Sequence, residues 1–79
     1  MTIHTLKQAI KECTNDIIFT FNGKSSGITS TVNNYIPVFQ AWYGNDIKEY
    51  DNIEDVMNDN FYNGKALADI VDEIEITIL

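Results

Sequence analysis

Residues that build reactive or metal-binding sites are scarce in this sequence. It contains one cysteine, one histidine and no arginine, because all five basic residues are lysines. A lone cysteine cannot form an internal disulfide, and no Cys/His set with zinc-ligand spacing can be assembled. Binding to phosphate groups requires clustered Lys and Arg. These absences argue against a zinc site, against direct binding of nucleic acid and against docking on an acidic membrane surface.

Long apolar runs are also absent. The longest is far shorter than the ~20 residues that span a bilayer. The chain begins Met1-Thr2-Ile3-His4, without the basic segment and apolar stretch of a signal peptide. We therefore expect a soluble, cytoplasmic protein with no membrane association.

The sequence does contain enough apolar residues for a folded domain. Of its 79 residues 44% are apolar, and its formal net charge is −7. This apolar fraction is too large for a disordered chain of that net charge. This length favours one domain covering residues 1–79.

We expect the segment Tyr35–Tyr50 to form the centre of the fold. It reads as a strand, a tight turn at Gly44-Asn45-Asp46 and a shorter partner strand. Because strand side chains alternate, the first strand has two largely apolar faces. One face carries Ile36, Val38, Gln40 and Trp42, and the other Pro37, Phe39, Ala41 and Tyr43.

Before this segment, apolar spacing predicts a helix from Thr2, its N-cap, to about residue 14, and Thr5 followed by Gln8 offers a competing capping box. Alternation predicts a strand at Ile17–Phe21, a turn or flexible loop at Asn22–Gly27, and a short edge strand at Ile28–Val32.

After it, Asn52 is predicted to cap a short helix, Ile53–Asn58, and a second helix is expected over residues 65–71. The strictly alternating end, Glu73–Leu79, predicts a strand paired with the central or the first strand. The resulting order is α-β-β-β-β-α-α-β. We therefore expect an α+β domain with a mostly antiparallel sheet of four to five short strands and helices on one face.

Negative charge is concentrated in the second half of the chain. Residues 1–45 carry three lysines and two acids, whereas residues 46–79 carry two lysines and ten acids, a net charge of −8. The predicted binding surface is an acidic face on and beside the first C-terminal helix, formed by Asp51, Glu54, Asp55 and Asp59. Such a face can match a basic groove on another protein, including one that normally receives nucleic acid. The alternative is a solvated face that only keeps the protein soluble.

The remaining candidate sites do not support catalysis. The acids lack the order of an EF-hand loop, so no Ca²⁺ or Mg²⁺ site is expected. His4 is expected at the surface and Cys13 in the core. The loop 22–27 lacks the spacing and the helix of a phosphate-binding loop. We therefore expect no enzyme, no cofactor and no metal, but a protein that acts by binding another protein. The alternative is a structural homo-oligomer, such as a homodimer, that uses an apolar sheet face or an edge strand.

One resemblance concerns residues 36–76. The run Trp42-Tyr43-Gly44-Asn45-Asp46, the segment Ile53–Met57 and the run from Phe61 to Leu67 together resemble small uncharacterised proteins from phages and prophages of Gram-positive bacteria. The size, the acidity and the order of elements are also similar to those of some anti-CRISPR proteins, which imitate nucleic acid electrostatically. The resemblance implies a phage or mobile-element origin, and it transfers no site residues.

Overall fold

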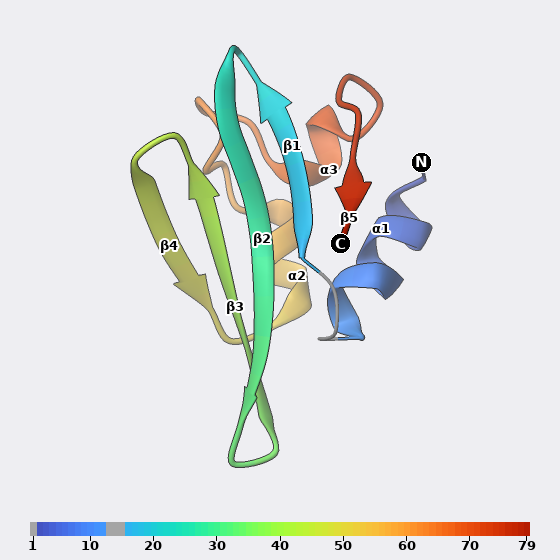
Figure 1. Ribbon diagram of the computed structural model, residues 1–79, viewed down its shortest axis with the longest axis vertical. Helices are drawn as coiled ribbons and strands as arrows, with labels where there is room; N and C mark the ends of the chain where they lie inside the picture. The colour runs from blue at the N-terminus through green and yellow to red at the C-terminus, as the bar shows by residue number, and fades with distance from the viewer. Residues whose placement is uncertain (1, 13–15) are drawn as a thin grey trace.

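The computed structural model describes residues 2–12 and 16–79. These residues form one antiparallel sheet of five strands in the order β4-β3-β2-β1-β5, with three helices packed on one of its faces (Figure 1). This arrangement confirms the predicted α+β class and the predicted order of elements. The elements are α1 (Ile3–Lys11), β1 (Ile17–Phe21), β2 (Lys24–Asn33), β3 (Ile36–Tyr43), β4 (Asp46–Tyr50), α2 (Ile53–Asn58), α3 (Leu67–Ile70) and β5 (Thr77–Ile78).

The core lies between the helices and the inner face of the sheet. Along β3 the buried positions are Phe39, Ala41 and Tyr43, and the residues between them are half-buried. Of the two faces predicted for this strand, the one with Phe39, Ala41 and Tyr43 therefore points into the core. Helix α1 presents Leu6 and Ile10 to this layer. Fully buried residues from four different elements meet there, and they include Leu6, Ile17, Ile28 and Leu67.

Two helix starts follow the predicted capping chemistry. The Thr2 hydroxyl accepts a hydrogen bond from the Thr5 amide at 3.2 Å, and Asn52 Oδ1 accepts one from the Asp55 amide at 2.8 Å. Each bond satisfies an amide that has no partner within its own helix. The predicted helix end and Cys13 lie outside the described residues.

The longest hairpin extends beyond the body of the domain. Strand β1 pairs with β2 only as far as Ile28, whereas β2 and β3 stay paired out to Asn33 and Ile36. Strand β4 pairs with β3 no further than Phe39. Residues 31–38, the hairpin arm, therefore have no strand on either side, and Figure 1 shows them projecting from one end of the molecule.

The expectation for residues 22–32 was partly wrong. Only Asn22 and Gly23 form the turn, with φ values of 52° and 73°, and β2 begins at Lys24. Positive φ at both central residues makes a two-residue hairpin turn, which returns the chain directly into the next strand. Strand β2 lies inside the sheet between β1 and β3, so it is not the predicted edge strand.

Two C-terminal elements are shorter than predicted. Tyr62 and Lys65 exchange backbone hydrogen bonds of 2.9 and 3.1 Å around a turn, so α3 begins only at Leu67. The final strand is limited to Thr77–Ile78, because β5 pairs with only two residues of β1. Its pairing with the first strand was one of the two predicted options. Within the described ranges, no helix is both long and apolar enough to cross a bilayer.

Candidate functional site

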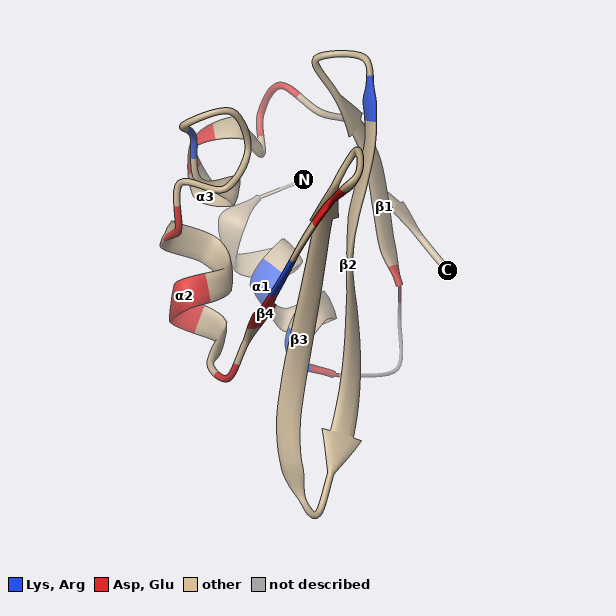
Figure 2. Ribbon diagram, turned by 90° about the vertical axis from the view of Figure 1, so that its left-hand side faces the viewer, with Lys and Arg blue, Asp and Glu red and all other residues tan. Residues whose placement is uncertain are grey.

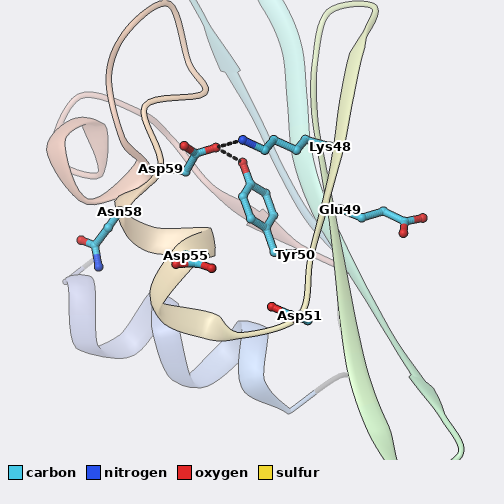
Figure 3. Close-up of a pocket in the computed structure, with 7 residues that line it drawn as sticks. All are labelled: Lys48, Glu49, Tyr50, Asp51, Asp55, Asn58 and Asp59. Atoms are coloured by element: carbon cyan, nitrogen blue, oxygen red, sulfur yellow. Dashed lines mark hydrogen bonds and ion pairs between the residues drawn. The ribbon is translucent and has the colours of Figure 1, made fainter.

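A cleft lies between β4 and α2, where the acidic half of the chain turns from strand to helix (Figure 3). Its volume is about 460 Å³. We call it the acidic cleft; its lining residues are Lys48, Glu49, Tyr50, Asp51, Asp55, Asn58 and Asp59. Three of the four predicted site residues, Asp51, Asp55 and Asp59, therefore meet at one place.

Asp51 and Asp55 are held near each other by one side-chain amide. Asn52 Nδ2 donates to Asp51 Oδ1 at 3.0 Å and to Asp55 Oδ2 at 2.8 Å. The same residue caps α2 through its Oδ1 atom. Both carboxylates are exposed at the start of the helix, where the helix dipole favours negative charge. Asn52 therefore both begins the helix and places two carboxylates side by side at the solvent boundary.

Asp59, unlike Asp51 and Asp55, is paired with a lysine and a tyrosine. Its Oδ2 atom accepts hydrogen bonds from Lys48 Nζ and from the Tyr50 hydroxyl, each at 2.7 Å. The Lys48 hydrogen bond is the main reason that the pKa of Asp59 is lowered, and the Tyr50 bond adds to it. Burial raises the pKa of Tyr50, and donation to Asp59 raises it further. Asp59 is thus ionised but already partnered, and it fastens the end of α2 to β4.

Glu54 does not reach the cleft. Its carboxylate pairs with Lys7 on α1, so it joins two helices. It lies outside the acidic cleft, although its side chain remains 62% exposed on α2. Asp51, Glu54 and Asp55 lie within five residues of one another in the sequence. The packing of α1 against α2 decides which of the three carboxylates pairs with a lysine.

Sequence reasoning missed Glu49 as a lining residue. It lies on β4 opposite Gln40, and Figure 3 shows its side chain pointing away from Tyr50 and Asp59. Strand alternation explains this orientation, since Lys48 and Tyr50 share one face of β4 and Glu49 occupies the other. The cleft therefore presents two free carboxylates, Asp51 and Asp55, and one pair between Asp59 and Lys48.

The acidic cleft offers carboxylate oxygens that can accept hydrogen bonds. Over residues 2–12 and 16–79, no group of three or more His, Cys, Asp or Glu side chains is arranged to hold a metal ion. The lining residues include neither a histidine nor a cysteine. Cationic side chains of another molecule are the natural ligands for such a surface.

Comparisons of the chain with protein-family models, with curated proteins and with solved structures found no match.

Proposed function

We propose that this acidic protein, of phage or mobile-element origin, acts without catalysis by binding another protein whose contact surface is basic. A groove that normally receives nucleic acid has the required charge. The observation that supports the proposal is the pair of exposed carboxylates, Asp51 and Asp55, that Asn52 holds together at the acidic cleft.

The two carboxylates have acceptor positions that remain accessible to an incoming Lys or Arg. The charge of the Asp59 carboxylate is already balanced by the Lys48 ammonium group, so Asp59 contributes mainly to the stability of the cleft. Ten of the twelve acids lie in residues 46–79, and their summed field attracts a basic partner before contact. Exposed charges of this kind act mostly on the rate of association.

The experiment measures association kinetics with a basic protein captured from a Gram-positive host lysate and then purified. The test variant is Asp51→Asn with Asp55→Asn. The matched control is Asp72→Asn with Glu73→Gln, which removes the same charge from two exposed residues after α3. At low salt we expect association of the test variant to be about tenfold slower, with little change in dissociation, and a weaker salt dependence.

Two results would contradict the proposal. Equal effects of both double variants would mean that only the net charge matters. An unchanged rate and salt dependence in the test variant would show that the cleft is merely a solvated surface. Thermal unfolding of each variant separates these outcomes from a loss of fold, since removing a first-turn acid costs up to about 1 kcal/mol.

The absence of catalysis has its own test. The purified protein is assayed against phosphoester, ester and peptide substrates, and no turnover is expected. Activity that survives a second, independent purification would refute this part of the proposal.

A further inference from the structure

The outer face of the sheet is not covered by any described element. All three helices lie on the inner face, as Figures 1 and 2 show from two directions. At the centre of the outer face is Trp42, the only tryptophan. It lies opposite Ile47 of β4 and Gly27 of β2, with Val38 further along its own strand. Ile47 is 64% exposed although it is a large apolar residue.

This outer face is nearly free of charge. Residues 25–45 form a run without a single Asp, Glu or Lys in a protein of net charge −7. Figure 2 accordingly shows the hairpin of β2 and β3 in the tan of uncharged residues. The pairing register places Lys24, Asp46 and Lys48 on the inner face. Within the five strands, all of them described, Glu49 is the one charged residue on the outer face. The Asp16 carboxylate reaches this face from the residue before β1, because it accepts a hydrogen bond of 2.9 Å from the Thr29 hydroxyl.

The surface around Trp42 is also flat. A Cβ atom on Gly27 would lie 2.4 Å from Trp42 Cζ2, so the indole rests directly against the backbone of β2. Glycine at this position therefore lets the largest side chain of the face lie along the sheet. The register also places Ile18 and Ile36 on this face, together with the uncharged polar residues Thr20, Ser25, Thr29, Thr31, Asn33 and Gln40. Sheet faces pack on one another at a separation of about 10 Å.

The sheet edges are less suited to association than the face. Strand β5 offers only two residues for pairing. Strand β4 carries Asp46, Lys48 and Glu49, and charges at an edge oppose the addition of another strand. Of the two oligomer interfaces considered for this chain, the apolar face is therefore favoured over an edge strand.

We propose that the outer face is the interface of a symmetric dimer, in which two sheets pack face to face and the helices lie outside. The molecule measures 35 × 24 Å across its two longer axes, which sets an upper limit of about 840 Å² for the outer face. A dimer must therefore use most of this face to reach the ~800 Å² per partner of a standard interface. Two copies of a protein with charge −7 repel each other, and this nearly neutral face is the side on which they can meet while the acidic helix α2 lies on the opposite side of the sheet (Figure 2).

The proposed dimer does not depend on the proposed function. The two can be tested separately, because they should respond to salt in opposite directions. Screening weakens the attraction between an acidic cleft and a basic partner, but it also weakens the repulsion between two like-charged copies. Binding through the cleft should therefore fall as salt rises, whereas dimer formation should increase.

The test is sedimentation velocity of the full chain from about 10 µM to about 1 mM. Salt is varied from about 0.01 M to about 1 M, where the Debye length shortens from about 30 Å to about 3 Å. The mass should rise from the 9.0 kDa of one chain to twice that value and no further, and more readily at high salt. Trp42 emission should shift to shorter wavelength over the same concentrations, because the indole loses water.

Two variants locate the interface. Ile47→Glu adds a charge on the outer face beside Trp42, its partner across β3 and β4, and Val32→Glu adds one on the opposite face of the hairpin arm. The two residues are similarly exposed, at 64% and 60%. We expect at least tenfold weaker dimerisation for Ile47→Glu and wild-type dimerisation for Val32→Glu. A monomer at every concentration and salt, equal effects of the two variants, or growth beyond the dimer would each overturn the proposal.

Discussion

The hydroxyl group of Tyr62 is the feature whose removal makes the sharpest prediction about stability. Tyr62 is 1% exposed, and its hydroxyl has no hydrogen-bond partner among the described residues. Its ring lies in an aromatic cluster, 5.6 Å from the ring of Phe19, 5.9 Å from Tyr43 and 5.1 Å from Phe61. Phenylalanine preserves these contacts and removes only the oxygen.

The expected effect of Tyr62→Phe is a gain in the free energy of unfolding. A buried polar group without a partner costs about 1–3 kcal/mol. The oxygen's own dispersion contacts are worth a few tenths of a kcal/mol, which leaves a net gain of about 1–2 kcal/mol. A domain of this size has a total stability of roughly 4–12 kcal/mol, and each kcal/mol raises Tm by about 4–8 °C.

Two further Tyr→Phe substitutions provide the controls. Tyr50→Phe removes a 2.7 Å hydrogen bond to Asp59 and should lower stability by about 1 kcal/mol, because Asp59 is partly exposed and water replaces the lost donor in part. Tyr35→Phe acts on a side chain that is 98% exposed and should change stability by less than about 0.5 kcal/mol.

The assay is urea unfolding at neutral pH, supported by thermal scans. The expected order of stability, from highest to lowest, is Tyr62→Phe, then Tyr35→Phe and wild type together, then Tyr50→Phe. A loss of stability in Tyr62→Phe would refute it, since that result would mean the hydroxyl makes a favourable bond in the folded protein. Burial raises the pKa of Tyr62, so ionisation of the unfolded chain above its ordinary pKa of ~10 draws the protein toward unfolding. Tyr62→Phe should therefore also lose less stability than wild type at alkaline pH.

Two other predictions concern the acidic cleft and the outer face. The lowered pKa of Asp59 means that its contribution is present above the ordinary carboxyl pKa of ~3.9 and is lost as the pH falls through the lower, folded-state value. Asp59→Asn should therefore be less stable than wild type at neutral pH, with a difference that shrinks below about pH 4 in urea titrations; a constant difference would contradict the pairing with Lys48. Gly27→Ala should lose about 1–3 kcal/mol and alter the emission of Trp42, because the new methyl group would overlap the indole and the Ile17 carbonyl. Unchanged emission would show that the indole does not rest on β2.

The sequence predicted the elements whose signals are local. Helix α1 has an amphipathic pattern and a capping threonine, α2 has Asn52 as its N-cap, and β3 alternates in burial from Val38 to Tyr43. The start of β2 was missed because Ser25, Ser26 and Gly27 have low strand propensity by themselves. Gly27 belongs in a strand only because Trp42 of the next strand covers it, which is a tertiary contact.

The acidic face was predictable to a similar extent. Asp51, Asp55 and Asp59 line the same cleft because they lie just before, within and at the end of the short helix α2, which packs beside β4. The pairing of Glu54 with Lys7 spans 47 residues, and the Lys48–Asp59 pair depends on the hairpin bringing β4 beside α2. Such long-range pairs decide which acids are free, and no local pattern contains them.

The hairpin arm gives part of this small domain an independent opening equilibrium. Residues 31–38 bond only across the hairpin, and seven of the eight side chains are exposed, so separating the two strands there uncovers no core. Their amide protons should exchange with solvent through local fraying, at a rate nearly unaffected by substitutions in the core. The turn at Asn34 and Tyr35 is therefore the point at which a foreign peptide can be inserted, and at which a protease can cut, with the sheet behind it still folded.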